Sequence, residues 1–169
     1  TEKLLFIEKP TDIFSHNDFA INFDFELVTR GKTSQELSST NGFIGEKENL
    51  FIEEGATIEF STLNCKTGKI YIGKNAEIME GSNIRGSLAL CEDSKINLGT
   101  KLYGGTTIGP HSKVGGEVNN IVIFGYSNKG HDGFLGNSVV GEWCNLGADT
   151  NSSNLKNNYA SVKLWNFRK

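Results

Sequence analysis

A branched aliphatic residue occurs at every sixth position from residue 72 to residue 114. These positions are Ile72, Ile78, Ile84, Leu90, Ile96, Leu102, Ile108 and Val114. An α-helix, with a period of about 3.6 residues, and a simple strand, with a period of about 2, do not produce this spacing. A six-residue repeat is typical of a parallel β-helix, in which each repeat contributes one short strand and one corner. We therefore predict an all-β protein built from stacked triangular coils.

The repeat also places a small residue four positions after most of the aliphatic residues. Ala76, Ser82, Ser94, Thr100, Thr106 and Ser112 follow this rule, and Leu88 is the exception. We expect each aliphatic side chain to point into its coil and each small one to lie where the chain turns. Because one coil cannot bury its own apolar side, several coils must stack. The alternative is a chance six-residue spacing in a β-sandwich.

The repeat continues outside this run in shifted frames. Further repeats begin at Ile52, Ile58, Phe134, Val140 and Leu146. The frame slips once within residues 59–71 and once within the glycine-rich residues 115–133. We interpret each slip as an insertion that loops out of the coil, and loops on a rigid scaffold often carry functional residues.

The composition is that of one globular domain with an appendage. The chain has 169 residues, a formal net charge of −3 and 37% hydrophobic residues. Since there is no basic excess, we expect no nucleic-acid partner. No apolar run is long enough to cross a bilayer and no signal peptide is visible, so we expect no membrane partner. The chain begins with Thr1 and not Met, so we expect that an upstream segment was removed.

The three cysteines show no pattern of a disulfide framework or a metal site, and they indicate a reducing compartment. Cys65, Cys91 and Cys144 are odd in number and lack CxxC spacing, which argues against a disulfide framework and against a zinc site. Cys144 takes the small position of its repeat, which favours packing over reactivity. We predict a cytoplasmic protein, because unpaired cysteines persist in a reducing compartment.

The first fifty residues differ in kind from the repeats. Phe19, Phe23 and Leu27 follow one another at intervals of four, as on one face of a helix. We predict a helix at about residues 17–30, although the alternation of apolar residues there would also suit a strand. Residues suited to its ends are Ser15 or Asn17 at the start and Gly31 after the finish.

These features divide the chain into two parts. We predict an N-terminal arm at residues 1–50 and a β-helix domain at residues 51–169. Pro10 and residues 38–42 are expected in loops. The helix of the arm would cover the open first coil, or the arm would link the domain to one outside this chain.

Two short motifs after the second slip hold residues suited to catalysis. They are Lys129-Gly130-His131 and Asn145-Leu146-Gly147-Ala148. Imidazole has an ordinary pKa of about 6.5, so His131 is a candidate to accept a proton near neutral pH. The alternative is a solvated histidine in a turn, which is how we interpret His111.

The stretch from Ser127 to Asn154 resembles the acetyltransferase half of the bifunctional glucosamine-1-phosphate N-acetyltransferase/UDP-N-acetylglucosamine pyrophosphorylase (GlmU) family. Within that family it is most similar to the fused sugar-phosphate nucleotidyltransferase/acetyltransferases of the Bacteroidetes type. The resemblance implies a left-handed coil, a homotrimer and active sites in the grooves between subunits. A left-handed coil is an exception to the usual crossover rule, and spacing alone does not reveal it.

The resemblance also implies roles for individual residues. His131 matches the general base that takes a proton from the sugar amine as the amine attacks acetyl-CoA. The backbone N–H of Ala148 matches a contact of the cofactor near the thioester, where it would stabilise an oxyanion. Asp132 or Glu142 would orient the imidazole of His131, and the sequence does not choose between them.

The remaining candidates concern the sugar phosphate. Asn145 and Asn154 match asparagines that hold the sugar and the base, although asparagine is also common at the corners of a β-helix. Phe134 stands where the family often has a tyrosine, and Leu155 replaces another tyrosine, so the identity of the sugar is open. Candidates to bind the phosphate are Lys129, Lys156 and Lys163, followed by Lys101 and Arg85.

The repeats fade after Leu146, although the family builds much of its acetyl-CoA surface from later coils. We therefore expect a fragment that lacks the last coils and a nucleotidyltransferase domain, with Mg²⁺ required only by that domain. The tail with Val162, Leu164, Trp165 and Phe167 would then have to cover the last coil.

Three functions compete. The first is an acetyl-CoA-dependent N-acetyltransferase that acts on an amino-sugar phosphate, such as glucosamine 1-phosphate. The second is a non-catalytic β-helix that trimerises or regulates a nucleotidyltransferase, since folds alone do not define functions. The third is a three-histidine zinc enzyme, which His16, His111 and His131 serve poorly because only two of them fall among the repeats.

Overall fold

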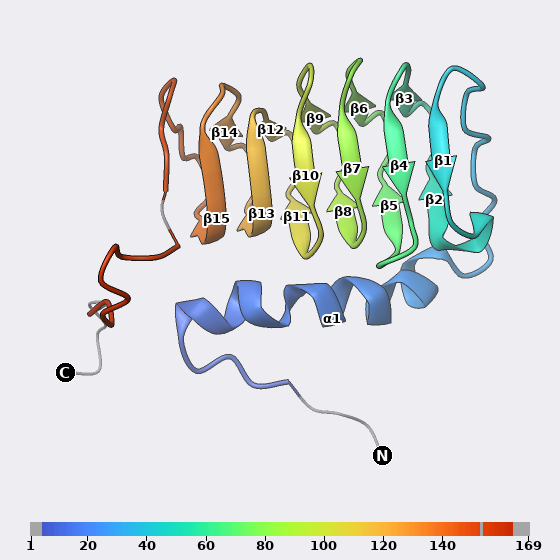
Figure 1. The fold of residues 1–169 in the computed structure, drawn as a ribbon. Helices are drawn as coiled ribbons and strands as arrows, with labels where there is room; N and C mark the ends of the chain where they lie inside the picture. Colours follow the sequence, from blue (N-terminus) through green and yellow to red (C-terminus); the bar gives the residue numbers. More distant parts are fainter. Residues whose placement is uncertain (1–4, 153, 164–169) are drawn as a thin grey trace.

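The computed structural model describes residues 5–152 and 154–163. These residues form a left-handed parallel β-helix of about six turns and one N-terminal α-helix, α1 (Pro10–Thr29). Figure 1 shows the coils stacked side by side, with α1 along their flank. The fold class that the six-residue repeat predicted is therefore confirmed, and the sandwich alternative is excluded.

The strands run parallel to their neighbours in two sheets. The larger sheet contains β1 (Gly42–Ile44), β2 (Leu50–Ile52), β4 (Thr62–Asn64), β5 (Ile70–Ile72), β7 (Asn83–Arg85), β8 (Leu88–Leu90), β10 (Lys101–Tyr103), β11 (Thr106–Ile108), β13 (Glu117–Ile123) and β15 (Phe134–Val140). The smaller contains β3 (Thr57–Ile58), β6 (Glu77–Ile78), β9 (Lys95–Ile96), β12 (Lys113–Val114) and β14 (Asn128–Lys129). A short 3-10 helix, η1 (Lys47–Asn49), precedes β2. Because β13 pairs with both β10 and β11, the larger sheet bends around two sides of the coils.

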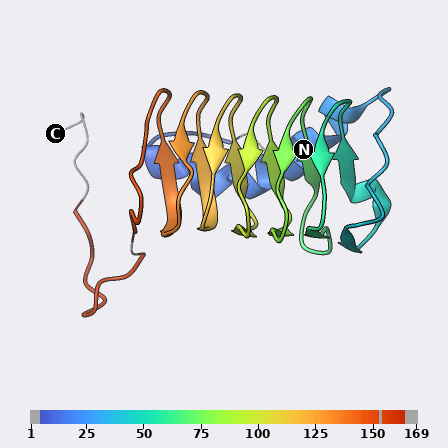
Figure 2. The same ribbon diagram turned by 90° about the horizontal axis from the view of Figure 1, so that it is seen from above.

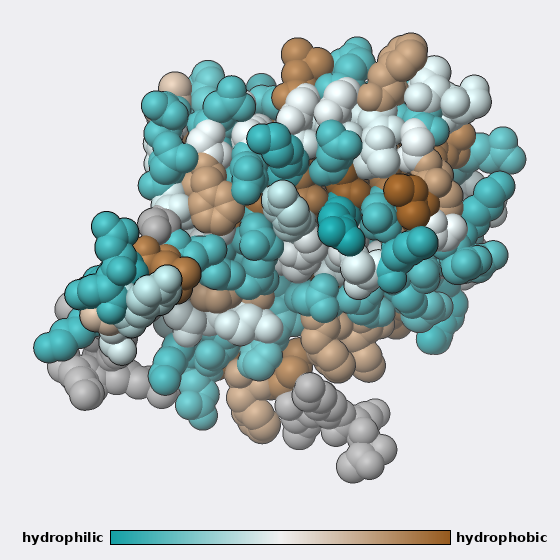
Figure 3. All heavy atoms as spheres, viewed as in Figure 1, coloured by the Kyte–Doolittle hydropathy of each residue, from teal (hydrophilic) through white to brown (hydrophobic). Residues whose placement is uncertain are grey.

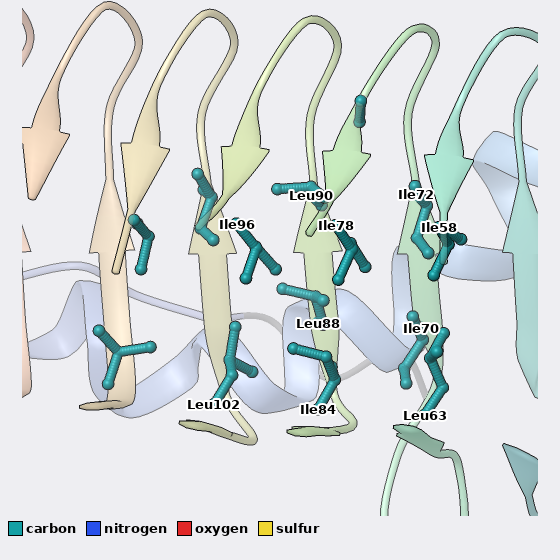
Figure 4. Close-up of a cluster of buried hydrophobic side chains, with 14 of the residues drawn as sticks. Ile58, Leu63, Ile70, Ile72, Ile78, Ile84, Leu88, Leu90, Ile96 and Leu102 are labelled. Atoms are coloured by element: carbon teal, nitrogen blue, oxygen red, sulfur yellow. The ribbon is translucent and has the colours of Figure 1, made fainter. Parts of the chain in front are cut away.

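The register stacks the aliphatic side chains into columns inside the coils. Ile78, Ile96 and Val114 follow one another on the smaller sheet, and Figure 4 shows part of this interior. All the aliphatic positions of the run from residue 72 to residue 114 are at most 1% exposed. Burial of one such side chain stabilises the fold by roughly 1.5–3 kcal/mol. Each side chain needs the neighbouring coils to reach this burial.

The small residues lie at the corners, as predicted. Thr100 and Thr106 are fully buried. The Thr100 hydroxyl donates to the Asn97 carbonyl at 2.6 Å, and the Thr106 hydroxyl donates to the Tyr103 carbonyl at 3.1 Å. A short side chain with a hydroxyl therefore fills the narrow corner and satisfies a buried backbone acceptor.

The first frame slip lengthens a coil and the second frame slip shortens one. Ile52 pairs with Ile72, twenty residues later, whereas Ile72 pairs with Leu90, eighteen residues later. In the second slip Val114 pairs with Lys129 after only fifteen residues. The prediction of a looped-out insertion in residues 115–133 was therefore wrong. A shift of frame looks the same in the sequence whether residues are gained or lost.

The shortened coil changes which residues face inward. β13 runs without a break through the corner that separates β10 from β11, with Asn120 there at a φ of +54°. In β15, which pairs with β13, Leu135 and Val140 belong to the core, at 6% and 8% exposure. Phe134, the start of a repeat in the sequence pattern, lies half-buried outside the core.

The helix α1 begins earlier than predicted. Pro10, expected in a loop, occupies its first turn, where the missing N–H costs no hydrogen bond. The Asp12 carboxylate accepts hydrogen bonds from the backbone N–H groups of Glu8 and Lys9, both at 2.9 Å. The expected start near Asn17 was wrong because this residue serves packing and not capping. The helix ends at Thr29, close to prediction, and Gly31 follows at a φ of +74°.

The helix covers the flank of the coils and not their open end. Figures 1 and 2 show that it runs along most of the stack, and it contacts β13, β15, β11 and β8. The side chains of Asn17, Ile21 and Phe25 are buried in this contact. Within the described residues, no helix combines the length and the hydrophobicity that a membrane-spanning segment requires.

The open first coil is covered by the chain that follows the helix. The Gln35 amide donates to the Ala56 carbonyl at 2.9 Å, and the Asn41 amide donates to the Ile58 carbonyl at 2.6 Å. Leu37 packs against the core between them. β1 pairs with β4, so the stack begins inside the predicted arm, before residue 51.

The buried Asn17 amide holds α1 to the coils, and its removal tests this contact. Its Nδ2 donates to the Gly105 carbonyl at 2.6 Å, and its Oδ1 accepts from the Thr107 hydroxyl at 2.8 Å. We expect Asn17→Ala to lower the free energy of unfolding by about 1–3 kcal/mol, because buried partners lose their hydrogen bonds. Urea unfolding measures this change. The exposed Ser15→Ala is the control and should stay within about 0.5 kcal/mol of the parent; equal effects would contradict the assignment.

Candidate functional site

A groove lies at the corner where the chain passes from the smaller sheet to the larger sheet. It has a volume of about 370 Å³, and its lining includes Lys101, Glu117, Asp132, Phe134 and Asn151. The turn that follows β14 enters this corner with the motif that contains the candidate base. The site therefore combines residues from four successive coils.

Lys129 lies inside the coil and not in the groove. The register places it one level after Val114, in a column that is otherwise aliphatic at the preceding levels, and it is 2% exposed. Its Nζ donates to the backbone carbonyls of Gly115 at 2.9 Å and His131 at 2.7 Å. Burial lowers the pKa of this ammonium below its ordinary value of 10.5, and the charge of Asp132 acts in the opposite direction. The geometry therefore does not support Lys129 as a ligand of phosphate in this chain.

The turn that carries His131 is fixed from two sides. Lys129 holds the His131 carbonyl from the interior, and the Asn97 amide donates to the Gly130 carbonyl at 2.8 Å. Gly133 has a φ of +118°, and a Cβ there would lie 2.4 Å from the Thr150 carbonyl oxygen, so a larger residue does not fit. The backbone of this turn is thus held firmly while its histidine is exposed.

The imidazole of His131 faces solvent. Among the described residues, neither Asp132 nor Glu142 forms a hydrogen bond or an ion pair with it. Asp132 lines the groove, while Glu142 is exposed at the next corner of the chain. The prediction that one of these carboxylates orients the ring stays a prediction.

Phe134 and Asn154 meet over the backbone of Gly136. A Cβ on Gly136 would lie 2.5 Å from the Phe134 ring and 2.9 Å from the Asn154 amide nitrogen. The Phe134 N–H donates to the Asn151 side chain at 2.7 Å. Both predicted sugar ligands therefore lie on the side of the coil that holds the groove.

The other predicted ligands lie elsewhere in this chain. Asn145 accepts a hydrogen bond from the Asn128 amide at 3.1 Å, which is the ladder role considered as its alternative. Ala148 is exposed in the turn after it. Lys156 donates to the Ser161 carbonyl at 3.3 Å in the tail, where Lys163 is exposed.

Two groove residues carried little signal in the sequence. Asn151 stands one coil after Phe134, but the six-residue pattern has faded there. Lys101, a weaker candidate, lies 3.9 Å from the Glu117 carboxylate and is 64% exposed, so this ion pair is weak. The buried Lys129 was detectable, because it stands six residues after Ile123 where the repeat calls for an aliphatic residue.

The three cysteines and His111 lie outside the groove. Burial raises the pKa of the Cys65 and Cys91 thiols to about 11. Cys144 packs against the core in its small position, and His111 occupies a turn at a φ of +55°. In the described part of the chain, no group of three or more His, Cys, Asp or Glu side chains is placed to hold a metal ion.

Comparison of the sequence with models of known protein families and with curated protein sequences found no match. The fold therefore defines the class of this protein, a left-handed parallel β-helix with a helical arm.

The buried ammonium of Lys129 gives stability a specific dependence on pH. Its pKa is lowered on folding, so the unfolded chain binds more protons than the folded chain between the folded pKa and 10.5. Stability contributed by this group therefore rises with pH through that window. We expect the parent to gain stability relative to Lys129→Met as the pH increases from 7 towards 10.5, measured by urea unfolding. A difference between the two proteins that does not change with pH would contradict a buried, charged Lys129.

Proposed function

We propose that this chain is an acetyl-CoA-dependent N-acetyltransferase domain that acts on an amino-sugar phosphate such as glucosamine 1-phosphate. In this proposal it is one part of a bifunctional sugar-phosphate nucleotidyltransferase. The single observation that carries the proposal is the position of His131. An exposed histidine stands on a turn that Lys129 and Asn97 fix from both sides, beside the groove of the preceding coils.

The chemistry requires one proton acceptor and one site for negative charge. The imidazole of His131 removes a proton from the amine as the amine nitrogen attacks the thioester carbonyl carbon. The new N–C bond forms, the C–S bond breaks and the CoA thiolate takes up a proton. The Ala148 N–H is the proposed donor to the transient oxyanion, since preorganised backbone donors stabilise such charge.

The groove suggests how the sugar phosphate is held. Lys101 lines it and makes only a long contact with Glu117, so its ammonium can bind a phosphate. Phe134 offers an apolar surface to one face of a sugar, and the Asn154 amide lies beside it. In this assignment Lys101 takes the role that the sequence suggested for Lys129.

The proposal includes a homotrimer in the cytoplasm. Sites between subunits would explain why Asn145, Ala148, Lys156 and Lys163 do not meet His131 within one chain. Three free cysteines fit a reducing compartment.

Replacement of His131 tests the proposed base. We expect His131→Ala to lower kcat/KM about 10²–10⁴-fold, because a general base contributes about that factor. The assay follows CoA release from acetyl-CoA with glucosamine 1-phosphate, on the chain together with its native flanking domains. Circular dichroism should be unchanged, because the side chain is exposed.

His111→Ala is the matched control, since His111 is also an exposed histidine in a turn and lies outside the groove. Its activity should equal that of the parent. Full activity of His131→Ala, or equal losses in both variants, would contradict the assignment.

A second candidate function is assembly without catalysis, and the outer face of α1 favours it. Phe23 is 68% exposed and Leu27 is 65% exposed, one helical turn apart. Phe6, in the segment before the helix, is 69% exposed. Figure 3 shows hydrophobic residues gathered over α1 and this preceding segment. Such a stripe on a helix is typical of a surface that another protein covers.

Two measurements separate assembly from catalysis. If α1 mediates assembly, Phe23→Ser combined with Leu27→Ser should convert an oligomer into a monomer, as seen by light scattering. Asp24→Ser on the same helix should leave the mass unchanged. Titration with acetyl-CoA by calorimetry gives the second result, because an assembly module without catalysis should bind no acetyl-CoA. An unchanged mass in the double variant would contradict the role of this face.

A further inference from the structure

One corner of each coil repeats a four-residue unit. Its first residue has a positive φ, its second is small, its third is polar and its fourth points into the coil. The first residues are Gly55, Asn75, Asp93, His111, Tyr126 and Trp143, with φ between +54° and +80°. The fourth residues are Ile58, Ile78, Ile96, Val114, Lys129 and Leu146, which the register stacks level by level as far as Lys129. We call the first residues the corner column.

The tail contains the same unit once more. Tyr159-Ala160-Ser161-Val162 has the required order of residues, and Tyr159 already has a φ of +55°. Val162 stands sixteen residues after Leu146, within the range of fifteen to twenty residues that separates paired levels elsewhere. In the structure, however, this segment lies away from the stack (Figures 1 and 2), with Tyr159 82% exposed and Val162 61% exposed.

The backbone of the last coil has donors placed for this unit. At each lower level, the N–H of the third residue donates to the carbonyl of the small residue one coil later. These bonds join Thr57 to Ala76, Glu77 to Ser94, Lys95 to Ser112, Lys113 to Ser127 and Asn128 to Cys144, at 2.8–2.9 Å. Within residues 5–152 and 154–163, the Asn145 N–H has no such acceptor, and the Ala160 carbonyl is its counterpart in the tail. A second bond follows three of these units: the N–H groups of Met79, Asn97 and Gly115 donate to the carbonyls of Ile96, Val114 and Lys129 one coil later, at 2.7–2.9 Å. Gly147 stands in the position of these donors, and the Val162 carbonyl is its counterpart in the tail.

At the last coil, the corner column ends in aromatic side chains that stack on one another, and the last of these rings is exposed. The Tyr126 ring stacks on His111 and on Trp143, with ring centroids 4.9 Å and 4.8 Å apart. Trp143 is 74% exposed. The next residue of the column would be Tyr159, whose ring is of the kind that stacks on an indole.

We propose that residues 159–162 dock on the corner formed by residues 143–146 and complete a seventh coil. Tyr159 then extends the corner column, Ala160 lies over Cys144 and Val162 lies over Leu146. The occupant of this surface is a segment of the same chain, identified by its repeat and by matching backbone donors and acceptors. The inference does not depend on the proposed function.

An engineered disulfide tests the docked geometry. Adjacent strands are about 4.8 Å apart, and a disulfide needs Cα atoms separated by about 4.4–6.8 Å. We expect Ala160→Cys to form an intrachain disulfide with the native Cys144 under mild oxidation, identified by peptide mass mapping. The Cys65 thiol is buried and the Cys91 thiol is half-buried, and with a pKa of about 11 both react slowly at neutral pH.

The control is Ser161→Cys, whose side chain points away from the coil in the docked arrangement. It should form the Cys144 disulfide at least tenfold more slowly. Equal rates in both variants, or no disulfide with Ala160→Cys, would overturn the proposal. Covalent dimers through Cys144 would also overturn it, because a second copy would then occupy the surface.

Hydrogen exchange gives an independent result. If the tail docks, the amides of Asn145 and Gly147 should be protected in the parent and should exchange at least tenfold faster in Val162→Asp. Exchange at the same rate in both proteins would contradict the seventh coil. The three residues altered in these tests, Ala160, Ser161 and Val162, are all exposed in the structure, so the six preceding coils should fold in each variant.

Discussion

Burial of each aliphatic side chain in this molecule depends on the coils directly above and below it. Ile96 is fully buried because Ile78 and Val114 lie on either side of it in register. The backbone hydrogen bonds between strands also join neighbouring coils. Stability is therefore a sum of contacts between neighbours, and the two ends of the stack are the weak points. Residues 33–41 cover the first end, whereas the aromatic side chain of Trp143 remains open at the other.

The candidate site is built where the repeat is broken. One coil has lost three residues, and the interior position of its last strand holds Lys129 in place of an aliphatic residue. A buried ammonium requires acceptors, and it finds them in the carbonyls of Gly115 and His131. The same interaction that satisfies the lysine thus fixes the turn of the exposed histidine. A rigid backbone under a solvent-exposed imidazole is a suitable arrangement for proton transfer.

Two predictions from the sequence, the looped-out insertion and the start of α1, were wrong. The spacing located the second frame slip but not its sign, so a shortened coil was interpreted as an insertion. The start of α1 was placed near Asn17, since an asparagine before apolar residues resembles a cap. In the structure Pro10 and Asp12 start the helix, and Asn17 reaches the coil instead. Of the candidate ligands, Phe134 and Asn154 came together, while Asn145 belongs to a ladder.

The sequence by itself determined the stacked coils, their buried aliphatic columns and the corners with small residues. These follow from a local repeat, because the direction of each side chain depends on its own backbone and its nearest neighbours. Only the tertiary structure decided that α1 lies along the flank and that the Lys129 ammonium meets the carbonyls of Gly115 and His131. The first depends on Asn17 meeting Gly105, 88 residues away, and the second depends on two coils of unequal length. Contacts between remote residues are not encoded in a period of six, so they had to come from the folded chain.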